Sequence, residues 1–589
     1  MNYQVRGVLG NEEWQKGVSP LSALLLKNRE IFESFESFSS PNYESNISNP
    51  LLISGMNRCA ERILKAINSN EQIAVYSDYD CDGIPGAVVL SDFFKKIGYE
   101  KVTYYIPHRH KEGYGLNISA IDLLKNKEVT FIITVDLGIT NIKEVAYAQE
   151  IGIDVIVTDH HLPHVEVVDG TEMQILPPAY EVINTKKTNE TYKEKMLCGC
   201  ATAWKVVSAI LMYVKTSNKT EKTAFEQKIF DIPDGWEKWS LDMVGLSTVA
   251  DMVPLVGENR ILAYYGLKVL RKSKRMGLRA LLLSARANQD GLTEDDIAFT
   301  IAPRLNAASR MDTPELAFRL LSTDDYAEAQ ELAKSLNSLN TNRKESVGFI
   351  MKEVYKELQS QELATVIVIG NPIWSPGILG LIASKVLDTY SKPVFVWGRA
   401  EEENQFKGSC RSDGSVNLLD LMLAVEPDVF AHMGGHELAG GFSIFKEHIH
   451  TLEKRLIKGY ESVKKNDYIA AKNIFIDCEL PLSFVNYKTM DDIDRLSPYG
   501  VGNQKPTFLF KDLEIIEVRH FGKENNHLEL RLKRLDGEIK SYGYFMGAHS
   551  FEKNVGVLEV GKIISVVGQL ERDLYGSRKN IKVRIIDIV

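Results

Sequence analysis

Acidic and imidazole side chains follow three separate β-type runs of this chain. The runs are 73–76, 131–135 and 153–158, and the side chains that follow them are Asp78, Asp80 and Asp82, then Asp136, then Asp159, His160 and His161. The carboxyl ends of parallel strands meet at one crevice of an open α/β sheet, so we expect these side chains to converge there. Carboxylates and imidazoles gathered in one crevice are typical ligands of Mn²⁺ or Mg²⁺.

Helix capping is the alternative role for these acidic residues. Asp is a common N-cap, and for any single one of them capping and metal binding are equally good explanations. The repetition favours metal binding, because several carboxylates and two adjacent histidines would form a costly set of charges unless cations held them together. The sequence therefore predicts a metal centre.

Periodic patterns indicate the elements that position these residues. Apolar runs alternate with helical patterns up to about residue 270, which is typical of βαβ units around a parallel sheet. Between 322 and 359 apolar residues recur at steps of three or four, or a multiple, which predicts one long helix that bridges two domains. Strict alternation at 528–533 predicts strands in the tail, which we interpret as an OB-type barrel.

The predicted fold class is α/β, with a parallel-sheet domain and a smaller α/β domain joined by a long helix, plus a C-terminal OB-type β-barrel. The predicted domains are a helical and loop segment at 1–49, the catalytic domain at 50–275, a helical connector with the long bridging helix at 276–360, the smaller substrate-binding α/β domain at 361–465, and the OB-type nucleic-acid-binding domain at 466–589.

Composition is typical of a globular protein with several domains. The 589 residues are 44% hydrophobic and 25% charged, no stretch approaches a membrane span, and the polar start is not a signal peptide, so we expect a cytoplasmic protein. The six scattered cysteines form no disulfide pattern. A net charge of −9 argues against nucleic-acid binding at first sight, but the metal-ligand carboxylates inflate it and a groove needs only local positive charge.

Several motifs in order are similar to those of DHH phosphoesterases. The stretches at 78–83, 134–140, 159–161 and 249–255 resemble the four motifs of that superfamily. Accessory motifs at 107–109, 112–116, 257–260, 302–310, 407–412 and 434–436 resemble its RecJ branch. The resemblance extends from about Pro20 to the C-terminus, and the ordered set is highly specific.

The resemblance implies a nuclease with two Mn²⁺ or Mg²⁺ ions. Asp136 would bridge both ions, Asp80 would bind one, and the other would be bound by Asp82, His160 and Asp251. Asp78 would be a ligand or would support one, and His161 would face the scissile phosphate. Two such cations lower the pKa of a shared water and neutralise charge on the phosphate.

Arginine suits the substrate side of such a site, because its planar fork of N–H groups matches a phosphate. The candidate substrate-binding residues are Arg109, Arg304, Asn306, Arg310, Ser409, Arg411, Gly434, Gly435 and His436. The family pattern assigns the terminal 5′-phosphate to Arg109, Ser409 and Arg411, and His436 to a phosphate or leaving-group contact. For a lone arginine a solvated surface charge is the commoner role, and it is the placement within motifs that favours function.

The function that the resemblance implies is a 5′ to 3′ exonuclease of DNA recombination and repair that releases mononucleotides from single-stranded DNA carrying a 5′-phosphate. The alternative enzyme is a DHH phosphodiesterase for short oligoribonucleotides or cyclic dinucleotides, against which the long helix and the β tail argue. A scaffold that has lost its ligands and a pyrophosphatase are further alternatives. We expect a monomer, and a RecQ-type helicase and a single-strand binding protein stay open as partners.

Aromatic residues in the tail have two possible roles. They are Phe521, Tyr542, Tyr544, Phe545 and Tyr575. They could stack bases, as in OB-fold nucleic-acid modules, or fill the barrel core. The sequence leaves both roles open.

Overall fold

The computed structural model describes residues 2–10, 18–31, 34–168, 171–218, 221–360, 362–400, 404–463, 473–522, 525, 527–544, 555–573 and 580–589. The chain divides into two compact units, each described by itself. Unit 1 contains Met1–Ile47, Pro254–Val256 and Ala471–Val589, and unit 2 contains Ser48–Val253 and Gly257–Ala470. No helix in the described residues is both long and apolar enough to cross a membrane.

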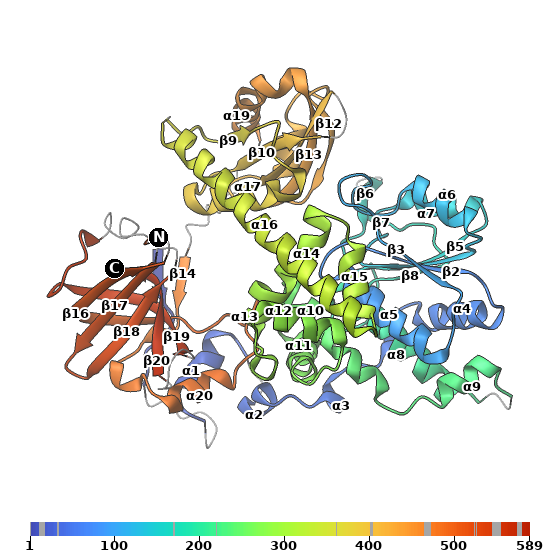
Figure 1. Cartoon of the computed structure of the whole chain (residues 1–589), viewed down its shortest axis with the longest axis horizontal. Coiled ribbons are helices and arrows are strands. Elements are labelled where there is room, and N and C mark those ends of the chain that lie inside the picture. Colours follow the sequence, from blue (N-terminus) through green and yellow to red (C-terminus); the bar gives the residue numbers. More distant parts are fainter. Residues whose placement is uncertain are drawn as a thin grey trace. The chain divides into compact units, whose positions relative to one another are not determined.

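A five-stranded parallel sheet in the order β3-β2-β4-β5-β8 forms the first layer of unit 2 (Figure 1). Every residue of β2 and β4 is buried, as expected for strands covered on both faces. Helices α6 and α7 share a core with one face of the sheet. The elements are β2 (Ile73–Ser77), β3 (Val102–Tyr105), β4 (Phe131–Val135), β5 (Asp154–Thr158), β8 (Glu181–Ile183), α4 (Met56–Asn68), α5 (Gly83–Ile97), α6 (Ile118–Asn126), α7 (Ile142–Glu150), α8 (Gly199–Thr216) and α9 (Ala224–Phe230), with a hairpin of β6 (His164–Val168) and β7 (Thr171–Ile175).

Helices α5 and α8 pack closely because a glycine lies at their contact. A Cβ on Gly86 of α5 would lie 2.6 Å from a Val135 methyl group and 3.1 Å from Cα of Cys200. A larger residue there would push α5 away from the end of β4 and from the start of α8. The close packing matters because Asp136 follows β4 and Asp82 precedes α5.

The predicted bridging helix is confirmed as α16 (Tyr326–Gln359), a helix of 34 residues. Its first half packs against the other helices of the connector, and its second half shares a core with the second sheet through Val347, Ile350 and Val354. Helices α10 (Leu241–Ala250) and α11 (Gly257–Leu270) precede the connector, whose other helices are α12 (Met276–Ala285), α13 (Glu294–Asp296), α14 (Ala302–Met311) and α15 (Glu315–Ser322).

The smaller α/β domain has a mixed five-stranded sheet in the order β12-β13-β11-β10-β9. Helix α17 packs on one face together with α16, and α18 and α19 pack on the other. The elements are β9 (Ile367–Gly370), α17 (Pro376–Tyr390), β10 (Val394–Arg399), β11 (Gln405–Arg411), α18 (Leu418–Leu423), β12 (Phe430–Gly435), β13 (Ala439–Phe445) and α19 (Leu452–Ser462).

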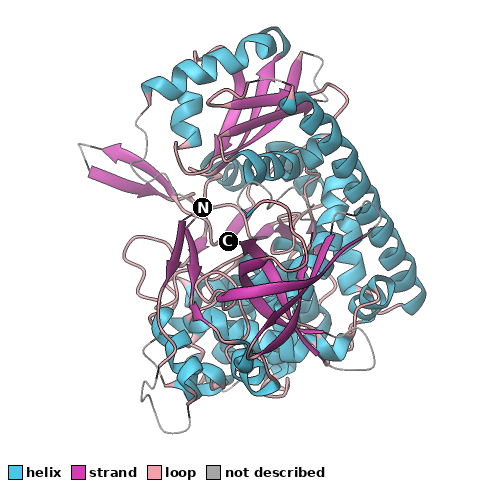
Figure 2. Ribbon diagram, turned by 90° about the vertical axis from the view of Figure 1, so that its left-hand side faces the viewer, coloured by secondary structure: helices cyan, strands magenta, loops and turns pink. Residues whose placement is uncertain are grey.

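Unit 1 is built on a closed barrel, which confirms the OB-type prediction. The strands pair in the order β16-β17-β18-β20-β19, and β19 pairs back to β16. Figure 2 shows the barrel as a group of magenta strands beside the C-terminus. Alternate residues such as Leu528, Leu530 and Leu532 point into its core. The elements are β15 (Cys478–Glu479), α20 (Tyr487–Asp494), β16 (Phe508–Phe521), β17 (His527–Arg534), β18 (Gly537–Gly543), β19 (Ile563–Asp573) and β20 (Asn580–Ile588).

The segment predicted at 1–49 as helical and loop also contains a strand. It contains α1 (Pro20–Asn28), α2 (Phe35–Ser39) and α3 (Tyr43–Asn46), but it begins with β1 (Asn2–Val5), which pairs in parallel with β14 (Asn473–Ile476). Leucines of α1 belong to the barrel core. A pairing between segments so far apart in the sequence leaves no local pattern, so the sequence analysis missed it. The predicted boundaries at 50, 275, 360 and 465 stay predictions.

Three residues between α10 and α11 also belong to unit 1. The Leu255 N–H donates to the Val501 carbonyl at 2.7 Å, and Leu255 is 1% exposed. A Cβ on Gly500 would lie 2.7 Å from a Leu255 methyl group, so the chain fits tightly here. The segment Pro254–Val256 is thus anchored in the β module, although the residues on both sides of it belong to unit 2.

Candidate metal centre

The turn after β2 presents three carboxylates at the sheet edge. Asp80 Oδ1 accepts hydrogen bonds from the N–H groups of Asp82 (2.7 Å) and Gly83 (3.2 Å), which fixes the turn. Asp82 accepts from the N–H groups of Gly199 (2.6 Å) and Cys200 (2.8 Å) at the start of α8. The positive end of that helix stabilises the carboxylate.

Asp136 lies at the end of β4 in a left-handed conformation, with φ of +63°. This conformation is uncommon for a residue with a side chain. A Cβ on Gly199 would lie 2.5 Å from Cβ of Asp136, so only glycine fits opposite it. Asp136 is therefore held between the strand end and the start of α8.

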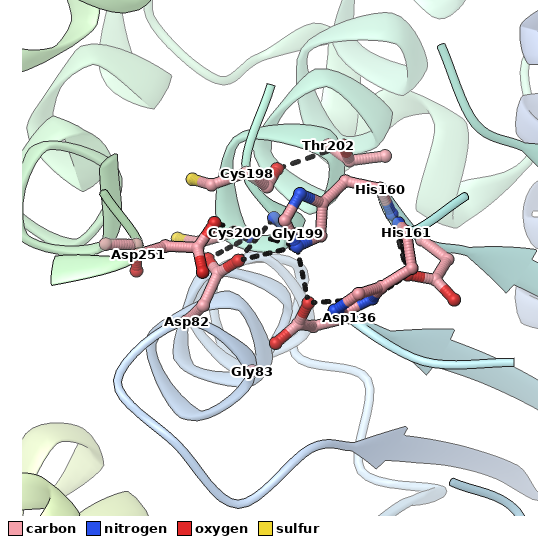
Figure 3. Close-up of polar contacts among 12 residues, drawn as sticks. Asp82, Gly83, Asp136, His160, His161, Cys198, Gly199, Cys200, Thr202 and Asp251 are labelled. Atoms are coloured by element: carbon pink, nitrogen blue, oxygen red, sulfur yellow. Dashed lines mark hydrogen bonds and ion pairs between the residues drawn. The ribbon is translucent and has the colours of Figure 1, made fainter. Parts of the chain in front are cut away.

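His160 lies between carboxylates from three elements (Figure 3). Its Nε2 is 3.1 Å from Asp136 Oδ1, 3.6 Å from Asp82 Oδ2 and 3.7 Å from Asp251 Oδ2. Burial, followed by the neighbouring His161, lowers the pKa of His160 to about 3, so the ring is neutral. A neutral imidazole surrounded by carboxylates is the protonation state that binds a metal ion.

The donor set fits divalent cations. Three groups of side chains each bring their ligand atoms within 4.8 Å of one another: Asp136, His160 and His161; Asp82, His160 and Asp251; and Asp78, Asp80 and Asp136. Among the described residues, buried atoms of Asp78, Asp136 and His160 lack a hydrogen-bond partner. Buried lone pairs without partners are costly unless an ion takes them up.

The carboxylates also repel one another. Burial and then the charge of Asp80 raise the pKa of Asp82 to about 6. Burial and then the charge of Asp82 raise the pKa of Asp251 to about 9 and hold that of Asp136 well above its usual range. A cation in this crevice would reverse those shifts.

Asp159 orients His161 toward the centre. Its Oδ1 is 2.8 Å from His161 Nδ1, and its Oδ2 accepts from the Ile139 N–H at 2.9 Å. Burial opposes charge on both groups, but this hydrogen bond raises the pKa of His161 and lowers that of Asp159. The Tyr114 hydroxyl donates to the Asp136 carbonyl at 3.0 Å and lies 3.1 Å from His161 Nδ1. The sequence analysis placed Asp159 at this crevice but gave it no specific role, and it assigned no role to Tyr114, although both lie inside its motifs.

Three predicted arginines gather in one cluster. Arg310 donates to the Gly377 carbonyl at the start of α17 (3.2 Å), and Arg411 donates to Ser409 Oγ (3.2 Å). Burial, then the charge of Arg109, lowers the pKa of Arg310 to about 9, and burial together with Arg109 lowers that of Arg411. The Arg109 guanidinium lies 4.8 Å from the ring centre of Tyr79. In the sequence, Tyr79 lies between Asp78 and Asp80 of the first acidic motif. We name Arg109, Arg310, Ser409 and Arg411 the arginine cluster.

Arg304 belongs to a second basic group. It donates to Asn337 Oδ1 at 3.0 Å and to the Thr300 carbonyl at 2.7 Å. Burial, then the charge of Arg304, lowers the pKa of Arg343 and of Lys344 on α16. The Asn306 amide oxygen is buried without a hydrogen-bond partner among the described residues. The sequence analysis missed Arg343 and Lys344 because they lie on a helix without a motif.

The glycine motif at 434–436 lies at the exposed end of β12. Gly435 has φ of +143°, and a Cβ there would lie 2.4 Å from the Ala439 carbonyl, so the turn into β13 requires glycine. The His436 N–H donates to that carbonyl at 2.8 Å. In the described part of the chain, no hydrogen bond or ion pair joins the His436 side chain to the metal-ligand groups.

The tail aromatics gather on the barrel surface. Phe521, His527, Tyr542 and Tyr544 contact one another, and Tyr542 and Tyr544 are stacked at 6.4 Å. None of them belongs to the buried core cluster, and Lys582 lies over both tyrosine rings. Of the two roles left open, this placement favours stacking for these three predicted aromatics. Phe545 and Tyr575 lie outside the described residues.

Comparisons with known proteins agree with the geometry. Family models match at 72–232 (DHH family, N-terminal domain), 360–459 (DHHA1 domain) and 476–587 (RecJ OB domain). The single-stranded-DNA-specific exonuclease RecJ of Bacillus subtilis is 32% identical over 97% of this chain and 68% of its own length. That of Haemophilus influenzae is 31% identical over 86% of this chain and 85% of its own length.

Solved structures lead to the same family. RecJ of Thermus thermophilus in complex with Mn²⁺ matches with a TM-score of 0.79 and 25% identity, covering 100% of this chain and 79% of that one. An exonuclease RecJ bound to manganese matches with a TM-score of 0.58 and 30% identity over 70% of this chain and 96% of that one. With its ordered motifs, its converging ligand groups and its barrel, the chain belongs to the RecJ family of DHH proteins.

Proposed function

We propose that this protein is a metal-dependent hydrolase that removes mononucleotides from the 5′ end of single-stranded DNA in recombination and repair. One observation carries the proposal: Asp136 belongs to two of the ligand groups. It is supported by the arginine cluster, which adjoins the first acidic motif through the contact of Arg109 with Tyr79. The names of the relatives, single-stranded-DNA-specific exonucleases, support the substrate.

The residues fit a site with two Mn²⁺ or Mg²⁺ ions. We assign Asp78, Asp80 and Asp136 to one ion, and Asp82, His160 and Asp251 to the other, with Asp136 bridging both. When bound, such cations lower the pKa of water and neutralise charge on a phosphodiester. The ions found in the Thermus thermophilus relative support this assignment.

His161 is proposed to act on the reacting phosphate. Asp159 accepts a hydrogen bond from its Nδ1 and favours the protonated ring, so His161 can donate a proton or a hydrogen bond to a phosphate oxygen. Its side chain is 36% exposed, unlike that of His160 at 8%, and is therefore the accessible one of the pair.

Three members of the arginine cluster are proposed to hold the terminal 5′-phosphate. A terminal phosphate carries more negative charge than an internal diester, so paired guanidiniums favour a chain end over its middle. Arg109, Ser409 and Arg411 are assigned to this phosphate, and Arg304, Asn306 and Arg310 to the strand behind it. Gly434, Gly435 and His436 stay candidates for a leaving-group contact. The anchored end supports 5′ to 3′ polarity.

The setting of the reaction is also a proposal. A DNA substrate and six buried, unbridged cysteines support a cytoplasmic enzyme. A monomer fits a chain whose ligand groups all come from one copy. A RecQ-type helicase would supply single strands to such an enzyme, and a single-strand binding protein would meet the same substrate.

End-labelled oligonucleotides test the function. With Mn²⁺, the protein should release labelled mononucleotides at once from 5′-labelled single strands and only late from 3′-labelled ones, and chelation should stop both. A strand of RNA and a cyclic dinucleotide serve as controls for the alternative phosphodiesterase. Preferred cleavage of either control, or of duplex DNA, would contradict the proposal.

A further inference from the structure

A groove of about 640 Å³ lies in unit 1 between three segments that surround the barrel. The segments are the paired strands β1 and β14, the end of α1, and the loop at 502–507. All lining residues belong to unit 1, and none of them is a proposed metal ligand or a member of the barrel's aromatic surface. We name it the N-terminal groove.

The floor of the N-terminal groove is a closed polar network. Asp477 accepts hydrogen bonds from Arg29 (2.9 Å), from the Thr507 N–H (3.0 Å) and from the Asn28 amide (3.1 Å). The side chains of Arg29 and Asp477 are only 5% and 9% exposed, so their charges cancel inside the protein. The network fixes the shape of the groove. Because this buried ion pair is neutral as a whole, the net charge of the groove depends on its other lining residues.

One wall is a guanidinium stacked on a phenyl ring. Cζ of Arg6 lies 3.9 Å from the ring centre of Phe475, and Arg6 also donates to the Asn28 carbonyl at 3.0 Å. Both side chains are exposed, and Phe475, a residue type usually found in cores, is 36% exposed. Aromatic rings and guanidinium planes are the surfaces on which unpaired bases stack.

The remaining charges of the groove are mainly positive. Arg6, Lys27 and Lys505 line it against a single further carboxylate, Glu30. Lys505 also lies 3.8 Å from Glu571, so part of its charge is balanced at the groove wall. The whole chain has a net charge of −9, so this local excess of cations differs from the average surface. Local positive charge beside a stacking surface is a feature of single-strand binding sites.

We propose that the N-terminal groove binds a segment of single-stranded nucleic acid, with a base on the Arg6–Phe475 stack and the phosphates toward Lys27 and Lys505. The inference rests on the proposed function, because a nuclease needs a grip on the strand beyond the bond that it cuts. It adds a second contact to the aromatic surface of the barrel. The volume suits a nucleotide unit rather than a folded partner.

Strand binding by the full-length protein tests the stack. In EDTA, which prevents cleavage, fluorescence anisotropy would follow an oligonucleotide of about 30 nucleotides, about twice the largest footprint of an OB fold. The double variant Arg6→Ala and Phe475→Leu should weaken binding by about tenfold, the loss expected for one stacked base. Phe475→Trp keeps a stacking ring and should bind as the wild type does.

Salt dependence tests the phosphate contacts. Lys505→Ala should lower the slope of log affinity against log salt by about one, the value for one lost phosphate contact. The matched control is Lys488→Ala, which removes an exposed cation on α20 of the same unit and should leave the slope unchanged. Equal slopes for Lys505→Ala and the wild type would overturn the phosphate assignment.

Photocrosslinking keeps the inference testable if a variant fails to fold. Wild-type protein irradiated with an iodouracil-containing strand should give crosslinked peptides that contain Phe475. Crosslinks confined to β17 and β18, or wild-type affinity in the stack variant, would overturn the groove. A wild type that binds and crosslinks but cuts no single strand would instead contradict the proposed function, so the two failures are distinguishable.

Discussion

The metal centre and the arginine cluster are two regions with opposite electrostatic excess. In the first, burial and mutual repulsion raise the pKa of Asp82, Asp136 and Asp251. In the second, burial and mutual repulsion lower the pKa of Arg310 and Arg411. Like charges repel one another within each region, so each region favours a ligand of the opposite charge. The difference supports the proposal that cations bind in the metal centre and a phosphate binds in the arginine cluster.

Removing the charge of Asp136, the carboxylate shared by two ligand groups, should have the largest effect on hydrolysis. Asp136→Asn keeps a side chain that tolerates the left-handed conformation but loses the charge between the ligand groups. Hydrolysis of single strands should fall by on the order of a thousandfold or more. Single-turnover kinetics with saturating Mn²⁺ measure it, and Asp324→Asn, at a 91% exposed side chain, is the control. Near-normal turnover would contradict the assignment of Asp136.

Asp159→Asn should shift the pH profile. Asp159 raises the pKa of His161, so without its charge His161 loses its proton at lower pH. If the protonated ring acts in hydrolysis, the alkaline limb of the kcat profile should move to lower pH, and kcat near neutral pH should fall by about a hundredfold. His161→Gln should remove that limb altogether. An alkaline limb that stays in place in Asp159→Asn would show that His161 does not act through its proton.

Arg411→Ala tests the role of the arginine cluster. It should weaken binding by about 1.5–3 kcal/mol, as for hydrogen bonds to charged groups, and only for strands with a 5′-phosphate. Comparing KM for 5′-phosphate and 5′-hydroxyl strands measures the effect. Arg399→Ala, which removes an exposed arginine at the end of β10, is the matched control. Equal losses on both strands would refute a terminal-phosphate pocket.

The second basic group should matter less. Replacing Arg343 or Lys344 by alanine should raise KM a fewfold and lower the salt slope by about one each, because both are partly buried beside Arg304. Lys356→Ala, an exposed cation on the same helix, should have no effect. If Lys356→Ala raised KM as much, binding would depend on total charge and not on this group.

The smallest effect concerns stability without metal. Asp82 and Asp251 have folded pKa values of about 6 and about 9, above the ordinary value of 3.8. Between about pH 3.8 and pH 9 the folded state therefore binds more protons than the unfolded state. The free energy of unfolding should fall as the pH rises through this window. Thermal unfolding in EDTA should show Tm decreasing across this window, by a few degrees for each loss of about 1 kcal/mol in the free energy of unfolding. Added Mn²⁺ should flatten the trend, and a metal-free Tm that rose with pH would contradict it.

Local patterns account for most of what the sequence predicted. Asp78, Asp136 and His160 could be placed together because each follows a buried strand, and parallel strands end at one edge. The long helix was predicted because apolar residues recur at steps of three or four, or a multiple, along the sequence. By contrast, the hydrogen bond between Asp159 and His161 depends on side-chain orientation, and the approach of Arg343 to Arg304 depends on helix packing. Neither has a signature in the order of residues.

The anchoring of Pro254–Val256 limits how freely the two units can be exchanged. Asp251, a proposed metal ligand of unit 2, precedes this segment by three residues, and Leu255 is held by Val501 within unit 1. A chimera that replaced the barrel with that of a distant relative would keep every proposed ligand and still leave Leu255 without its partner. Evolution of the two units should therefore be linked at this position, and a successful graft should need the 254–256 and 499–503 segments from the same donor.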